Sequence, residues 1–173
     1  MADFSAQGLS NTSWALATLA FASVPLMDAM AAASIRTIEE MSHQDLANTA
    51  WAIAKLAFCH RPLLHAIAAA AIRKSVELVP QDLANTAWAF AMFSVCHEPL
   101  LESIAAASIP IISQFTSQNL ANTAWAFDIL EVRDAPLMHA ISAQALRSIS
   151  EFGTQPLANL AGCSTPLPGH AEF

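Results

Sequence analysis

The sequence predicts an all-α protein, a right-handed α-solenoid of four helical hairpins similar in kind to armadillo and tetratricopeptide superhelices. The first observation is a period of 37 residues, which separates the only tryptophans: Trp14, Trp51, Trp88 and Trp125. The second is that glutamine, leucine, asparagine and proline recur in the same register, so that residues 44–52 and 81–89 are both QDLANTAWA. A fixed period of this length indicates stacked supersecondary units rather than one globular core.

The repeat defines the domain organisation. We number the copies one to four from residues 5, 42, 79 and 116, and we predict one helical-repeat array over residues 4–161. A fifth copy begins in register within that range, but Gly162 stands at its tryptophan position and two prolines follow at 166 and 168. No helix is expected to continue through them. Residues 162–173 are therefore predicted to be an irregular C-terminal tail.

Copy two shows how each hairpin begins. Ser42 and Asp45 resemble a capping box, with a hydroxyl for the free amides and a carboxylate in the first turn. The first helix is expected from about Gln44 to Phe58. Apolar residues recur along it at helical spacing, which predicts one broad buried face that includes Trp51.

A proline marks the second helix of each hairpin. In copy two it is Pro62, and proline is favoured at the first helical position because its missing N–H would be unpaired there. The helix is expected from about Pro62 to Glu77, after a connector at 59–61. In copy three Pro110 stands where the other copies carry arginine, so we expect that helix to bend near Ser108.

Composition narrows the classes of function. Apolar residues make up 55% of the chain and charged residues 12%, and the formal net charge is -7, which argues against a chain that clamps nucleic acid along its whole length. Three cysteines give no disulfide framework and favour a reducing compartment. The first residues match neither a signal peptide nor an Arg-rich transit peptide. Charges and prolines interrupt the apolar stretches, so no membrane span is expected.

The candidate binding surface is a polar stripe on the first helices. Positions 45, 48, 52, 55 and 59 are predicted to lie on one face, opposite the tryptophan. A surface that varies between copies on a fixed frame is typical of readers of one RNA base per repeat. The alternative is that these are ordinary solvent positions. The candidate RNA- or partner-facing residues on this stripe are Asp45, Asn48, Lys55, Asp82, Asn85, Asn119 and Asn122.

Two subsets of candidates have structural alternatives. The repeated asparagine could contact bases, or its amide could bond the backbone of the next hairpin in a buried ladder that fixes register. Arg73 and Lys74, on the second helix of copy two, could follow a phosphate backbone or be solvated charges. Residues 41–77 hold four basic against two acidic side chains, a net +2, whereas residues 78–114 hold three acidic and no basic side chains. If RNA docks anywhere on this chain, copy two is the expected place.

No enzyme is predicted. Cys59-His60 and Cys96-His97 recur 37 residues apart, but neighbouring helices lie about 10 Å apart, too far for four ligands around one zinc ion. The chain has four glycines and no glycine-rich phosphate loop, and no nucleophile–base pair is evident. We predict no catalytic residues, metal, cofactor or small-molecule substrate.

The repeat unit resembles known helical-pair families. Gln118 to Phe127 read QNLANTAWAF, and the three sister copies are similar. This string resembles octotricopeptide-type repeats, the leucine-rich region of FAST-kinase-like and RAP-domain proteins, and the armadillo-like domain of an RNA-editing substrate-binding complex subunit. The resemblance covers about residues 4–161, and no RAP domain is visible.

The resemblance implies a module of organellar gene expression, mitochondrial or plastid, that acts in transcript processing, stability or translation. Its partner would be single-stranded organellar RNA or the proteins of an RNA-processing complex. The alternative function is a protein-interaction scaffold with no direct RNA contact. Family resemblance favours the first hypothesis, and the negative charge favours the second.

Overall fold

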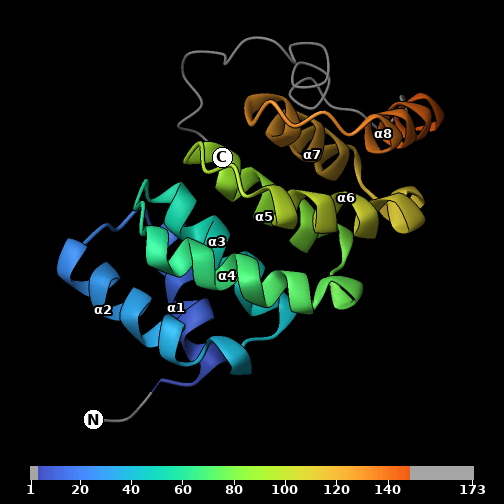
Figure 1. The fold of residues 1–173 in the computed structure, drawn as a ribbon. Helices are drawn as coiled ribbons and strands as arrows, with labels where there is room; N and C mark the ends of the chain where they lie inside the picture. Colours follow the sequence, from blue (N-terminus) through green and yellow to red (C-terminus); the bar gives the residue numbers. More distant parts are fainter. Residues whose placement is uncertain (1–3, 149–173) are drawn as a thin grey trace.

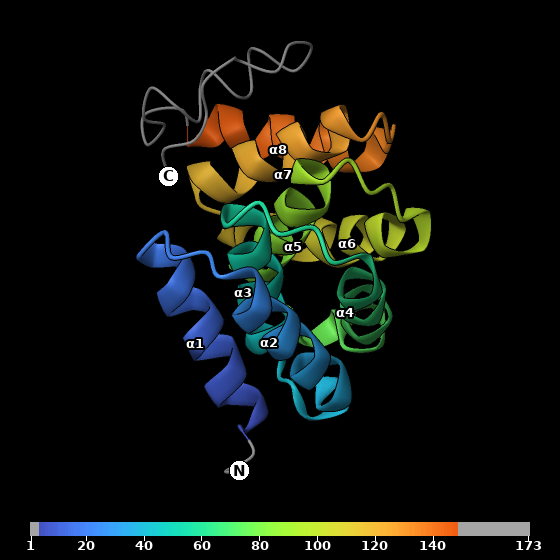
Figure 2. The same ribbon diagram turned by 90° about the vertical axis from the view of Figure 1, so that its left-hand side faces the viewer.

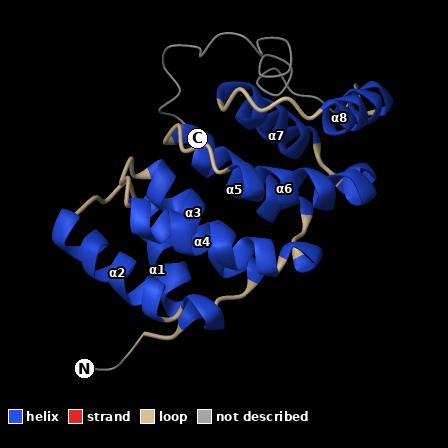
Figure 3. Cartoon of the chain, in the orientation of Figure 1, coloured by secondary structure: helices blue, strands red, loops and turns tan. Residues whose placement is uncertain are grey.

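The computed structural model describes residues 4–148, and within them the chain is helical throughout, with loops between helices and no strand (Figure 3). Two long helices form each hairpin, and a 3-10 turn follows the second helix of the first three hairpins. The helices are α1 (Ala6–Thr18), α2 (Val24–Arg36), α3 (His43–Lys55), α4 (Arg61–Arg73), α5 (Pro80–Met92), α6 (Glu98–Ile111), α7 (Ser117–Ile129) and α8 (Ala135–Arg147), with η1 (Ile38–Glu40), η2 (Ser75–Glu77) and η3 (Ile112–Gln114) between hairpins.

The hairpins stack in chain order, which confirms the all-α solenoid (Figure 1). The first helices pack side by side, α1 on α3, α3 on α5 and α5 on α7, and the second helices form the other layer (Figure 2). The first helices make much the closer contacts of the two layers. Alanine explains this, because its small side chain lets helix axes approach. Ala47, Ala50 and Ala54 of α3 are all buried.

The core lies between the two layers. Leu46 and Ile53 of α3 are buried against it, as are Leu64 and Ile67 of α4. The same positions are filled in the next hairpin, where Phe90 is fully buried. The predicted fifth copy and the tail at 162–173 lie outside the described residues.

The first helices begin and end by local rules. α3 starts one residue earlier than predicted, at His43, and its capping box is complete: the Ser42 N–H donates to Asp45 Oδ2 (3.0 Å) and the Asp45 N–H to Ser42 Oγ (3.2 Å). It ends at Lys55, before the predicted Phe58, because Ala57 has φ 52° and reverses the chain. The Phe58 N–H then donates to the Ile53 carbonyl, as in a Schellman motif.

This ending recurs in all four hairpins, with a left-handed residue that is not glycine in any of them. The residues are Ala20, Ala57, Ser94 and Glu131, with φ between 51° and 56°.

Proline lies in the first turn of every second helix, as predicted, but at the second helical position. In copy three α6 continues through Pro110 to Ile111. Proline is tolerated there because it stands in the last turn, where it removes one hydrogen bond whose acceptor carbonyl belongs to the exposed Ala106.

Histidine caps two of the second helices. The Leu63 N–H donates to His60 Nδ1 (3.1 Å), and the Leu100 N–H donates to His97 Nδ1 (3.2 Å). In copy four an aspartate is the cap: the Leu137 N–H donates to Asp134 Oδ1 (2.8 Å).

We expect His97→Ala to lower the free energy of unfolding by about 1 kcal/mol, because a first-turn amide loses its acceptor. His97→Asp should retain most of that free energy, since aspartate occupies the equivalent position in copy four. Urea titrations followed by circular dichroism would measure both. Ser23→Ala is the matched control, because Ser23 makes no capping hydrogen bond. Equal losses for His97→Ala and His97→Asp would contradict the capping role.

Candidate functional site

One ridge of each first helix stays open to solvent. In α3 it consists of Gln44, Asn48, Trp51 and Lys55, spaced four, three and four residues apart; Gln44 is exposed and the other three are half-buried. We call the corresponding residues of all four hairpins the open ridge. It comprises Gln7, Asn11, Trp14 and Thr18 on α1, Gln44, Asn48, Trp51 and Lys55 on α3, Gln81, Asn85, Trp88 and Met92 on α5, and Gln118, Asn122, Trp125 and Ile129 on α7.

Neighbouring helices cover the other sides of each first helix. Ala52 of α3 is fully buried, whereas its equivalent Ala15, which has no described helix before it, is exposed. Ala91 of α5 is buried, whereas its equivalent Asp128, which has no described first helix after it, is exposed. The second helices cover a third side. The open ridge is what remains, and it runs across the stack.

This geometry corrects the predicted polar stripe. Tryptophan was expected opposite the stripe, but it lies on the open ridge beside asparagine. Ala52, expected on the stripe, is fully buried. The residue two positions after the tryptophan is the one buried in the core: Ile53 in α3 and its equivalent Phe90 in α5.

The asparagines of the open ridge are unpaired. Asn48, Asn85 and Asn122 are half-buried and Asn11 is exposed. Among the described residues their side-chain amides form no hydrogen bond. The alternative of a buried amide ladder that fixes register is therefore wrong, because these side chains face outward from the helix layer. Each leaves one acceptor and two donor hydrogens available to a ligand.

The fourth position of the open ridge varies between hairpins. Lys55 is half-buried, takes part in no ion pair within residues 4–148, and is the only charged residue on the ridge. Its equivalents are Thr18, Met92 and Ile129. The Thr18 hydroxyl donates to the Trp14 carbonyl (2.9 Å), and Met92 is exposed. The ridge thus combines three invariant residues with one variable one.

Three of the predicted surface residues are instead capping residues. Asp45 is buried and accepts from the Ser42 N–H and hydroxyl. Asn119 accepts from the Thr116 N–H in the same way (3.1 Å). A side chain at the third helical position reaches back to the N-cap amide, so it turns away from solvent.

Asp82, the third of them, is 4% exposed and joins two hairpins. Its Oδ2 lies 2.6 Å from His43 Nδ1 of the preceding first helix. It also accepts weakly from the Val79 N–H (3.4 Å). The Val79 side chain cannot accept a hydrogen bond, so the capping box of α5 is incomplete. The interaction with His43 is therefore the stronger of these two contacts of the Asp82 carboxylate.

Arg73 and Lys74 are engaged by the preceding hairpin. The Arg73 guanidinium lies 2.6 Å from Glu39 Oε1 at the η1 turn. Lys74 Nζ donates to the carbonyls of Glu39 and Met41. These groups link copies one and two on the side of the second helices, away from the open ridge. Neither is free to follow a phosphate backbone while these contacts hold.

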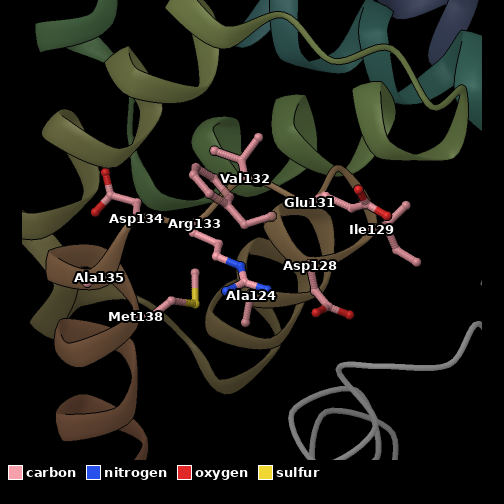
Figure 4. A pocket seen from close by; sticks show the side chains of 10 residues that line it. Ala124, Asp128, Ile129, Glu131, Val132, Arg133, Asp134, Ala135 and Met138 are labelled. Carbon is pink, nitrogen blue, oxygen red and sulfur yellow. The ribbon is translucent and has the colours of Figure 1, made fainter.

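A cavity of about 760 Å³ lies at the end of the described stack (Figure 4). Phe127 and Asp128 of α7, Val132 in the connector and Met138 of α8 contribute to its lining. Equivalent residues of earlier hairpins face the next first helix, as the buried Ala91 shows. The cavity thus lies on the face of copy four that corresponds to the stacking face of the earlier hairpins.

Within residues 4–148 no group of three or more histidine, cysteine or acidic side chains could hold a metal ion. Cys59 and Cys96 are free and exposed. Over the same residues, none of the helices has the length and apolar character needed to cross a membrane.

Comparison with known families gives one match. Residues 4–155 match the Tbc2 translation factor, N-terminal domain. No curated protein matches the sequence significantly. The matched region contains all four hairpins and therefore the whole open ridge.

Proposed function

This chain belongs to the family of the Tbc2 translation factor N-terminal domain, and from that premise we propose that it binds single-stranded RNA along its open ridge in organellar gene expression. The observation that carries the proposal is the repeated Gln, Asn and Trp on that ridge. The family's name favours translation over transcript processing or stability. The location, mitochondrial or plastid, rests on the resemblance to octotricopeptide-type repeats.

The side chains of the ridge suit unpaired bases. A partly exposed tryptophan offers a ring on which a base can stack, and such stacking contributes about 1–3 kcal/mol per base in single-strand binding proteins. Amide side chains can donate to and accept from the edges of an unstacked base. The described fold uses neither the exposed Gln nor the Asn side chains in hydrogen bonds, whereas a ligand that contacts each hairpin in the same way would use both in all four hairpins.

The variable fourth position would distinguish one hairpin from the next. Thr18, Lys55, Met92 and Ile129 differ in charge and in hydrogen-bonding capacity. If each hairpin holds one base, these residues would give each site a different preference. The invariant Gln, Asn and Trp of each hairpin would then position the RNA strand.

A protein-interaction scaffold is the second candidate. The net charge of -7 favours it, and so does the engagement of Arg73 and Lys74 within the array. Tryptophan is also enriched at protein interfaces. We propose no enzymatic activity, cofactor or small-molecule substrate for either function.

Binding of fluorescently labelled random-sequence single-stranded RNA at low salt tests the proposal. We expect the double variant Gln81→Ala/Asn85→Ala to weaken binding by about tenfold, because it removes two hydrogen-bonding side chains of one hairpin. Gln114→Ala is the matched control, since Gln114 is an exposed glutamine on η3, off the ridge. RNA binding by the double variant at the affinity of the control would contradict the role of the ridge.

Salt dependence separates contacts to the phosphates of RNA from hydrogen bonds to its bases. Lys55→Glu should weaken RNA binding and reduce the salt slope by about one, because it removes a phosphate contact. Arg73→Glu should change affinity much less, since Arg73 is tied to Glu39. Absence of any RNA binding at low salt by the folded chain would favour the scaffold instead.

A further inference from the structure

A lysine links the second helices at the junction between copies one and two. Lys74, at the end of α4, reaches back to the preceding hairpin, where its Nζ donates to the carbonyls of Glu39 and Met41. Arg73, the residue before it, pairs with the Glu39 carboxylate. The turn between two hairpins thus presents two backbone carbonyls to an ammonium group.

The junction between copies two and three has the same backbone but neither basic residue. Ile111 stands at the position of Lys74, with φ -111° and ψ 13° against φ -104° and ψ 13°. Pro110 stands at the position of Arg73. Neither side chain can donate a hydrogen bond, so these two positions of α6 provide no donor to η2.

Three backbone carbonyls at this junction lack a donor that their equivalents possess. Val76 and Leu78 occupy the two positions whose carbonyls bind Lys74 one junction earlier, and no described residue donates to their carbonyls. The carbonyl of Ala106 loses its helical donor because Pro110 has no N–H. Backbone carbonyls form strong, charge-assisted hydrogen bonds with ammonium groups. This junction therefore offers acceptors to an ammonium group from outside the array.

The residues that carry these carbonyls also line a groove of about 350 Å³ between η2 and α6. Most of its lining is apolar, and Val76, Leu78, Ala106, Pro110 and Ile111 belong to it. Val76 is 93% exposed, more than any other large apolar side chain of residues 4–148. The hairpins on both sides of the groove have stacked neighbours, so the groove is a feature of the middle of the array rather than of an end.

The surroundings of the groove are acidic. No lysine or arginine occurs between Lys74 and Arg133, whereas six acidic residues do. Glu77 stands beside Val76 in η2, and Glu102 lies one helical turn before the groove on α6. Both are exposed, and neither forms an ion pair within residues 4–148. This charge attracts a cation and repels the phosphates of RNA.

We propose that this groove binds a lysine side chain of a partner protein. We call its five residues Val76, Leu78, Ala106, Pro110 and Ile111 the lysine groove. The ammonium group would donate to the free carbonyls, as Lys74 does one junction earlier, while the alkyl stem packs along the apolar lining. Apolar neighbours of that lysine would contact the exposed Val76. Binding here is independent of RNA binding on the open ridge, which lies on the first helices.

An NMR titration of the isotope-labelled full chain with N-acetyl-lysine methylamide tests the lysine groove. We expect saturable shifts of the backbone amides of η2 and of the end of α6, with a Kd on the order of millimolar for so small a ligand. The matching norleucine compound has the same alkyl chain without the ammonium group. It should bind at least about tenfold more weakly, because it cannot donate to the carbonyls. Equal binding of the two compounds, or no saturable shift with either, would overturn the proposal.

Ile111→Lys supplies the ammonium group from within the chain, as copy two does. We expect it to weaken binding of N-acetyl-lysine methylamide by about tenfold or more, because the new side chain competes for the same carbonyls. Ile109→Lys is the matched control. It makes the same substitution on the same helix, but Ile109 is 37% exposed and does not line the groove. Its affinity should stay within about twofold of the natural chain, since an exposed charge is largely screened. Equal losses in the two variants would contradict a specific site.

Ala106→Leu blocks the groove without adding a charge. Ala106 is exposed, so the fold should tolerate the larger side chain even if Ile111→Lys does not fold. We expect it to weaken binding of N-acetyl-lysine methylamide by about tenfold or more, because its side chain fills the space that the alkyl stem requires. Binding by the folded Ala106→Leu variant at the affinity of the natural chain would contradict the proposal.

The residues beside the lysine distinguish a protein segment from other ligands. A blocked tripeptide with lysine between two leucines should bind several-fold more tightly than one with lysine between two serines, because the exposed Val76 adds apolar contact. Equal affinities would assign the groove to a free amine. Displacement of the leucine tripeptide by single-stranded RNA, with shifts of the same amides, would assign it to nucleic acid. Either result would overturn the role of a partner protein.

Discussion

Phe90→Ala is expected to lower the free energy of unfolding by about 3–5 kcal/mol, as truncation of a buried aromatic ring commonly does. Phe90 is fully buried between the two helix layers and meets the His97 ring edge-on, with centroids 6.5 Å apart. The hairpin has stacked neighbours on both sides, which limits how far the structure can relax into the cavity. Urea unfolding followed by circular dichroism would measure the loss.

Trp88→Ala is the informative comparison. Tryptophan is the larger side chain, but Trp88 is half-buried on the open ridge and packs against the edge of the core, whereas Phe90 lies within the core two residues away. We therefore expect less than half the loss found for Phe90→Ala, because the tryptophan ring already meets solvent. A larger loss for Trp88→Ala would show that tryptophan belongs to the core and would remove the basis of the open ridge.

Ala91→Asp is expected to destabilise the array by about 3–5 kcal/mol, because it would bury a carboxylate without a partner. Ala91 is 2% exposed on the side of α5 that faces α7. Copy four already carries aspartate at this position. Asp128 is exposed, since no described first helix packs against that side of α7.

Asp128→Ala is therefore the matched control, and it should change the free energy of unfolding by less than about 0.5 kcal/mol, as surface substitutions usually do. The pair tests the stacking order directly, because the same two residue types are exchanged at equivalent positions of two hairpins. Tolerance of Ala91→Asp, with an unchanged midpoint in urea, would contradict close packing between α5 and α7.

Much of the fold could be predicted from the sequence because its signals are local. The period of 37 residues gave the number and order of the hairpins. Ser42 and Asp45 indicated where α3 begins, and Pro62 indicated the first turn of α4. The two helix starts each depend on residues within one helical turn, and the period depends only on repetition of one short unit. The exact ends were harder, because the left-handed Ala57 that ends α3 is not a glycine.

The open side of the first helices could not be predicted in the same way. Hydrophobicity placed Trp51 in the core and Asp45 on the surface, whereas Trp51 is only half-buried, on the open ridge, and Asp45 is buried. A first helix has neighbours on three sides, and alanine fills two of those contacts. Alanine contributes little to a hydrophobicity pattern. Ala52 therefore gave no indication that its side of α3 is more deeply buried than the side that carries Trp51.

The roles of Arg73 and Lys74 depend on a different hairpin. Their partners are at Glu39 and Met41, more than thirty residues earlier in the chain. The sequence shows that these charges exist, but their pairing follows from how copies one and two meet. The free Lys55, by contrast, retains its predicted place on the first helix of copy two.

The nearest-neighbour packing of the first helices also bears on how such a protein can change over generations. Because α1 packs on α3, α3 on α5 and α5 on α7, removal or duplication of one whole hairpin would break no substantial contact between distant parts of the chain. The identical stretches 44–52 and 81–89 are what a recent duplication would leave. Every added hairpin would bring its own Gln, Asn and Trp in register, so the array could lengthen its recognition surface by inheritance of a single gene segment, while the fourth position diversified afterwards.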